Sequence, residues 1–143
     1  MRQMRMAVAL MLTAALALGA ASCKDNLAPS LLEYMGGIDG VAKLMDSWKG
    51  AMAADASLAN TLTSADRDMV ASGLVGEIAK ATETPMPGGS TDLVKVLQEK
   101  NLSKAALNSM GAALQKATVD SKLSPEATKG VTDLWNAAAG KAD

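Results

Sequence analysis

The sequence predicts an all-α protein of five or six helices. Apolar residues recur at spacings of three and four along most of the chain, which is the period of an amphipathic helix. Serine or threonine precedes several of these runs, in the position of a helix N-cap. No run alternates convincingly between polar and apolar residues, as a half-buried strand does. We therefore expect one helical domain over residues 30–143, with one hydrophobic core.

The first part of this domain predicts a short helical turn and then a long helix. Residues 31–35 form an apolar turn that Gly36 and Gly37 end. An apolar stripe then predicts a helix of about four turns over residues 38–53. Its members are Ile38, Val41, Met45, Trp48 and Met52. Residues 55–63 break this pattern, so we expect a connecting segment there.

Four further helices are expected, each beginning at a capping side chain. Their caps are, in order, Ser64, then Ser90 or Thr91, then Ser103, and last Ser124. Pro125 supports the last assignment because proline favours the first helical position. Residues 84–89, with two prolines and two glycines, make up the clearest loop. The apolar residues expected to face the core are Met69, Val70, Leu74 and Ile78, then Leu93, Val94 and Leu97, then Leu107, Met110 and Leu114, and finally Val131, Leu134, Trp135 and Ala138.

Residues 1–22 predict a secretory signal peptide. Arg2 and Arg5 make a basic start, residues 6–18 form an uncharged apolar run, and small residues follow. A membrane-spanning helix needs about 20 apolar residues, and this run is shorter. We therefore expect the leader to be removed during export rather than kept as a transmembrane anchor.

Cys23, the only cysteine in the chain, predicts a lipid anchor. Residues 20–23, Ala-Ala-Ser-Cys, resemble a bacterial lipobox, whose cysteine becomes lipid-modified and forms the new N-terminus. A single cysteine in an exported protein cannot form an internal disulfide, and a thioether to lipid accounts for it. Residues 23–29 would then be a lipidated tether. Ordinary cleavage after Ala21 is the alternative.

A lipoprotein of this kind is expected on the periplasmic side of a bacterial membrane. In lipoproteins that this leader resembles, lysine after the modified cysteine, here Lys24, usually permits sorting to the outer membrane. Membrane attachment would come from the lipid, because the basic residues are scattered and form no polybasic patch.

Composition excludes several classes of function. Without Arg2 and Arg5, 12 basic residues face 15 acidic ones, and this net charge of −3 argues against nucleic-acid binding. The chain has no histidine, so it has no Ser-His-Asp triad, no Cys-His pair and no imidazole metal site. Its acidic residues are mostly isolated, and neither a carboxylate pair nor a hard-metal cluster stands out. We expect neither catalysis nor a bound metal.

Several short motifs follow one another in a familiar order. Residues 30–37, Ser-Leu-Leu-Glu-Tyr-Met-Gly-Gly, are similar to the opening Ser-Leu-Tyr-Glu-Arg-Leu-Gly-Gly of truncated haemoglobins. Residues 52–58 stand where that family has Val-Leu-Ala-Asp-Pro-Arg-Leu, and residues 83–87 where it has a Gly-Gly-Pro loop. Asp92-Leu93, Asn101-Leu102-Ser103 and Leu107 fall where it has Asp-Met, Gly-Ile-Thr and Phe. The resemblance covers residues 30–120 almost without gaps and implies a globin-like, two-over-two helical sandwich.

The same register implies that the haem chemistry of truncated haemoglobins is absent here. Their haem-ligating histidine falls on Leu97, whereas haem iron needs an axial donor such as His, Cys, Met or Tyr. The other former haem-pocket positions are Trp48 and Lys49 for a Phe-Tyr pair, Thr61 and Leu62 for a stacking Phe, Gly73 and Leu74 for distal polar residues, and Leu93 and Leu107. We expect Leu97 to be buried against Leu93 and Leu107, in a core without a cofactor that is either filled or keeps a small apolar cavity.

These inferences predict a haem-free, lipid-anchored binding or structural module of the cell envelope. Its partner would be another envelope protein or a small apolar ligand. The alternative is a haem protein that binds oxygen or another gas through non-histidine ligation. The candidate iron ligands in that case are Lys49, Met45, Met110 and Tyr34.

Overall fold

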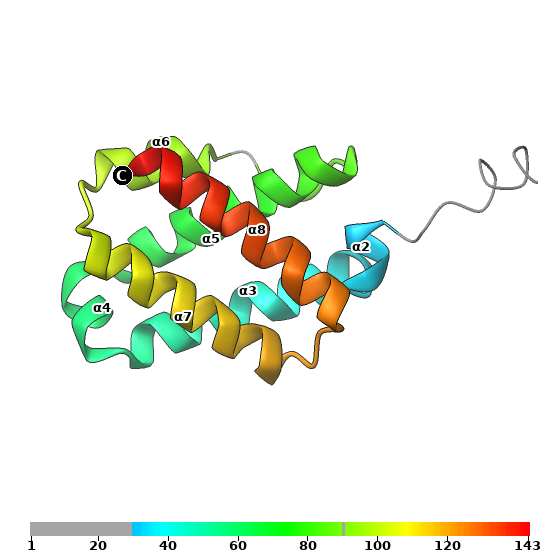
Figure 1. Cartoon of the computed structure of the whole chain (residues 1–143), viewed down its shortest axis with the longest axis horizontal. Helices are drawn as coiled ribbons and strands as arrows, with labels where there is room; N and C mark the ends of the chain where they lie inside the picture. The colour runs from blue at the N-terminus through cyan, green and yellow to red at the C-terminus, as the bar shows by residue number, and fades with distance from the viewer. Residues whose placement is uncertain (1–29, 90) are drawn as a thin grey trace, which may run out of the picture.

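This computed structural model describes residues 30–89 and 91–143 (Figure 1). These residues form seven α-helices and no strand. The helices are α2 (Leu31–Tyr34), α3 (Gly37–Ala54), α4 (Ala56–Thr61), α5 (Ser64–Thr82), α6 (Leu93–Glu99), α7 (Lys104–Asp120) and α8 (Pro125–Ala142). The expected all-α class is confirmed. The predicted signal peptide at 1–22, the predicted lipidated tether at 23–29 and Ser90 lie outside the described residues.

The four long helices pack around one core, with α3 beside α5 and α7 beside α8. α3 packs against α5 and α7, while α8 packs against α6 and α7 and also touches α5. Figure 1 shows α7 and α8, joined by a short loop, in front of α3 and α5. None of the described helices has both the length and the apolar character needed to span a membrane. The globin-like arrangement of these helices stays a prediction.

Capping side chains explain where the helices begin. Ser103 and Ser124 accept hydrogen bonds from backbone N–H groups of the first turn, as expected. The other two expected caps are wrong by one or two residues. Thr63, and not Ser64, caps α5, because Asp66 returns a hydrogen bond to the Thr63 N–H and completes a capping box. Asp92, and neither Ser90 nor Thr91, caps α6.

The expected connecting segment at 55–63 contains a helix, α4. Asp55 accepts hydrogen bonds from the N–H groups of Ser57 and Leu58, which starts the helix. Leu58 is buried and holds the helix against the core. A helix of six residues with one buried apolar side chain leaves no periodic signal in the sequence, and this is why the prediction missed it.

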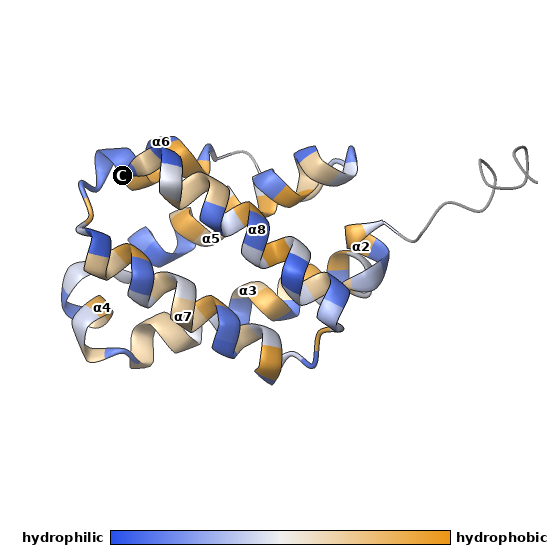
Figure 2. Cartoon of the chain, viewed as in Figure 1, coloured by the Kyte–Doolittle hydropathy of each residue, from blue (hydrophilic) through white to orange (hydrophobic). Residues whose placement is uncertain are grey.

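Most side chains expected in the core are buried, but two are exposed and two are only partly buried. Ile38 is 47% exposed because it lies in the first turn of α3, before the buried stripe that begins at Val41. Met69 is 38% exposed, whereas its neighbour Val70 is fully buried. Val94 and Leu134 are only partly buried. Figure 2 shows that the long helices carry both apolar and polar residues, as helices with one buried face do.

One buried hydrogen bond connects α3 to α7. The Trp48 indole Nε1–H donates to the backbone carbonyl of Met110 over 3.0 Å. Both residues are fully buried, so this polar pair is satisfied inside the core, as buried polar groups require. The hydrogen bond therefore joins α3 to α7 inside the core.

Candidate functional site

The positions that the resemblance to truncated haemoglobins assigns to a haem pocket, called the former haem-pocket positions here, lie almost entirely inside the hydrophobic core. Leu97 is 1% exposed, so its predicted burial is confirmed, and it belongs to the same core cluster as Leu93 and Leu107. The other apolar positions of this set are buried in that cluster as well: Trp48, Leu62 and Leu74. The predicted burial of Trp48 and Leu74 is therefore confirmed, whereas the burial of Leu62, in the expected connecting segment, was not predicted.

α5 and α6 touch at the level of their backbones. A Cβ atom added to Gly73 would lie 2.8 Å from the Cα atom and 2.9 Å from the Cβ atom of Leu93. One turn further along α5, a Cβ atom on Gly76 would lie 2.9 Å from the Gly89 carbonyl oxygen. Only glycine permits such approaches, and no layer of other atoms fits between the two segments there.

Polar contacts close the same seam between α5 and α6 on both sides. Ser72 Oγ donates to the Gly88 carbonyl and lies 3.0 Å from Thr91 Oγ1. Near the other end of α6, the Lys100 ammonium pairs with the Asp66 carboxylate. That ion pair, together with the backbone hydrogen bond from Thr63, holds the pKa of Asp66 below its usual value. Below, "the α5–α6 seam" means the contacts of Asp66 with Lys100, Ser72 with Thr91, Gly73 with Leu93, and Gly76 with Gly89.

Lys49 is the one former pocket position with a charge, and it lies at the surface. Its Nζ atom is 3.6 Å from Asp46 Oδ1 and 3.4 Å from Asp68 Oδ1, and 35% of its side chain is exposed. It therefore bridges α3 to α5. Of the other candidate iron ligands, Met45 and Met110 are buried in the core and Tyr34 is partly buried beside it.

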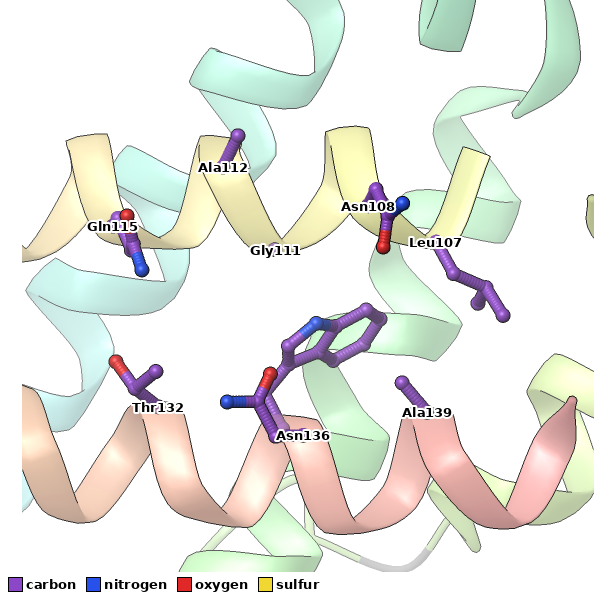
Figure 3. A pocket seen from close by; sticks show the side chains of 9 residues that line it. Leu107, Asn108, Gly111, Ala112, Gln115, Thr132, Asn136 and Ala139 are labelled. Carbon is purple, nitrogen blue, oxygen red and sulfur yellow. The ribbon is translucent and has the colours of Figure 1, made fainter. Parts of the chain in front are cut away.

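A second region with the character of a site lies between α7 and α8 and encloses about 260 Å³. We call it the α7–α8 groove. Its lining residues are Leu107, Asn108, Gly111, Ala112, Gln115, Thr132, Trp135, Asn136 and Ala139. Figure 3 shows Asn108 and Gln115 extending from α7 toward α8, and Thr132 and Asn136 extending from α8 toward α7. The groove therefore has walls of carboxamide and hydroxyl groups and contains no charged side chain.

Two polar groups of the α7–α8 groove have no hydrogen-bond partner among the described residues. Thr132 Oγ1 is shielded from solvent and unpaired. The Trp135 Nε1 atom faces the space above Gly111, since a Cβ atom there would lie 2.8 Å from it. In contrast, Trp48 Nε1 has Met110 O as its acceptor.

Nothing in the sequence pattern indicates the α7–α8 groove. Asn108, Gln115 and Asn136 are exposed residues of helices, where a carboxamide is ordinarily a solvated surface group. Only the pairing of α7 with α8 brings them to one place. Within residues 30–89 and 91–143, no three acidic or cysteine side chains gather closely enough to hold a metal ion.

Comparisons of this chain with protein-family models, with curated proteins and with solved structures find no match. The link to truncated haemoglobins therefore rests on the residues quoted above.

Proposed function

We propose that this protein is an exported, lipid-anchored module of the bacterial cell envelope, with a globin-like fold that does not bind haem, and that it acts by binding. The observation that carries the haem-free part is the contact between Gly73 and Leu93. In the register of the resemblance, α5 would lie on one face of the haem and α6 on the other. A macrocycle between them would have to separate two backbones that are in contact.

The side chains along this seam also lack a ligand for iron. Leu97 stands in the place of the family's histidine and is packed in the core, and an aliphatic side chain donates no electron pair to a metal. Lys49, the alternative ligand, has its Nζ atom at the surface, within 3.6 Å of Asp46 and 3.4 Å of Asp68, and not in the core beside Leu97. The residues of this structure therefore do not fit a haem.

Binding is a better account of the surface than catalysis. The α7–α8 groove presents amide, hydroxyl and indole groups and holds no nucleophile beside a general base. Such groups fix the orientation of a ligand through hydrogen bonds but supply no proton near neutral pH. The predicted lipid on Cys23 would keep this binding surface at the membrane.

A haem titration of the purified protein, followed in the Soret region, tests the haem-free proposal. We expect no saturable, shifted band. We also expect none from the Leu97→His variant, because a new imidazole does not open the α5–α6 seam. Circular dichroism at the same temperature would establish that the variant is folded. A Soret band that saturates at one equivalent of haem with the unchanged protein would overturn the proposal, and Lys49→Ala would then locate the ligand.

Lipidation is tested separately by growing cells with a labelled fatty acid. We expect label on the protein and in the membrane fraction, and loss of both in the Cys23→Ser variant, since no second cysteine exists. An unlabelled, soluble periplasmic protein whose N-terminus begins at Ser22 would instead establish ordinary cleavage after Ala21.

A further inference from the structure

The α7–α8 groove has hydrogen-bonding capacity that the described residues do not use. Thr132 Oγ1 is shielded from solvent and has no partner there, while buried polar groups in proteins almost always have one. Trp135 Nε1, which lies against Gly111, is not one of these buried unpaired atoms, so it is open to a hydrogen bond from the groove. Figure 3 shows the Thr132 side chain extending from α8 toward α7 at the wall of the groove. An unpaired hydroxyl and an accessible indole N–H at one hollow indicate a polar molecule that binds between them.

The other polar groups that line the groove are uncharged, and this indicates whether the bound molecule is charged or neutral. Asn108, Gln115 and Asn136 each offer a carboxamide, which donates through its nitrogen and accepts through its oxygen. A second hollow of about 300 Å³ continues along the same two helices past Asn108 and Asn136. Charged groups appear only at its far end, at Lys104 and Asp143. A charged ligand in the first hollow would lose its hydration without gaining a counter-charge, so the groove favours a neutral one.

The shape of the groove suits a ring that carries hydroxyl groups. Gly111, Ala112 and Ala139 are small, so a flat or chair-shaped ring can approach both helices closely. Hydroxyl groups on adjacent carbons donate and accept at once, which matches the dual character of carboxamides. The first hollow, about 260 Å³, is close to the small end of the usual size range for ligand sites.

We propose that the α7–α8 groove binds an uncharged saccharide of one or two rings, with the Trp135 indole N–H donating to a sugar oxygen. This proposal rests on the proposed function, because it names the ligand of a binding module. The ligand is polar, and it therefore differs from the apolar ligand that the sequence led us to expect. Because the groove is open to solvent, we expect a weak complex, with a Kd of about 1 mM.

The two tryptophans supply the experiment. Proton–nitrogen correlation NMR of the isotope-labelled full-length protein in detergent micelles gives one indole signal for each, and Trp→Phe variants assign them. The probes are two neutral disaccharides, cellobiose and N,N′-diacetylchitobiose. We expect at least one of them to shift the Trp135 signal along a saturable curve. The Trp48 signal should move much less, because its N–H is already bonded to Met110.

Matched variants separate binding in the groove from a general effect. Gly111→Ala puts a methyl group against Trp135 Nε1, and Asn136→Ala removes one carboxamide; we expect each to weaken binding about tenfold. Gly50→Ala and Asn60→Ala make the same substitutions at exposed helical positions outside the groove and should leave the curve unchanged. Asn136→Ala keeps the test informative even where Gly111→Ala disturbs packing.

Several outcomes would overturn the saccharide proposal. One is a Trp135 signal that neither disaccharide moves, in which case the unpaired groups are satisfied by water alone. Another is a shift of equal size with glucuronic acid or with a capped triglycine peptide, which would make the ligand charged or peptidic. A curve that Asn136→Ala leaves unchanged would place binding elsewhere. None of these outcomes bears on the Soret titration, so the haem-free proposal stands or fails independently.

Discussion

Trp48 and Trp135 meet edge to face, with their ring centroids 5.4 Å apart and their planes 77° from parallel. This is a preferred geometry for two aromatic rings, because the positive edge of one meets the negative face of the other. The pair joins α3 to α8, and the hydrogen bond from Trp48 to Met110 joins the same position to α7. Three helices are therefore held at one point beneath the α7–α8 groove.

The Trp48→Phe substitution should destabilise the protein more than Trp135→Phe does. Trp48→Phe removes the buried hydrogen bond between α3 and α7, and we expect the free energy of unfolding to fall by about 2–3 kcal/mol. Trp135 makes no such bond with the described residues, so its replacement should cost about 1 kcal/mol less. Urea unfolding of both variants measures the difference. Equal losses would mean that the hydrogen bond to Met110 contributes nothing beyond ring burial.

The Gly73→Ala substitution should open the α5–α6 seam. Its methyl group would meet backbone atoms of Leu93 that cannot move without the helix, and we expect a loss of about 2–3 kcal/mol in the free energy of unfolding. Gly50→Ala is the matched control, because nothing lies within 4 Å of the added Cβ atom. That variant should gain about 0.5–1 kcal/mol from the helix propensity of alanine. A neutral Gly73→Ala would show that α5 and α6 are not in firm contact.

Acid should weaken the α5–α6 seam through Asp66. Its pKa in the folded protein lies below the ordinary value of 3.8, mainly because of the side-chain bond to Lys100. The stabilisation is therefore complete well above pH 3.8 and is lost as the pH falls through the lower, folded-state pKa. We expect Asp66→Asn to lower the free energy of unfolding by about 1 kcal/mol near neutral pH and to have almost no effect in strong acid.

Urea midpoints measured across this pH range check the contribution of Asp66. Asp120→Asn is a suitable control, because Asp120 is exposed and makes no salt bridge with the described residues. The two variants should differ at neutral pH and converge in acid. A deficit in Asp66→Asn that persists unchanged into strong acid would attribute the effect to the capping box with Thr63 rather than to charge.

Helical periodicity and capping residues were reliable predictors because each depends only on residues within the same helix. A helix repeats every 3.6 residues, so the stripes through Trp48, Leu97 and Met110 identified buried faces without any knowledge of neighbouring helices. Ser103 and Ser124 were found for the same reason, since a cap bonds to its own first turn. At the start of α5 the sequence predicted Ser64, and the cap is instead the preceding residue Thr63, which exchanges hydrogen bonds with Asp66.

Contacts between different helices could not be predicted from caps or periodicity. Ile38 fits the apolar stripe, yet in the tertiary structure 47% of it is exposed. Gly73 was expected only to occupy a former polar position, and its contact with Leu93 depends on how closely α6 returns to α5. The α7–α8 groove depends on two helices meeting, because Asn108 and Asn136 lie 28 positions apart in the chain.

By itself, then, the sequence determined the all-α class, most of the helices and the burial of most core residues, including Trp48, Leu74 and Leu97. It also supplied the leader and Cys23, whose roles remain predictions. Tertiary structure alone decided that α5 and α6 close on one another and that unpaired polar groups collect between α7 and α8. The physical reason is range: caps and periodicity act within a few turns of one helix, whereas contacts and hollows form between helices that the sequence lists far apart.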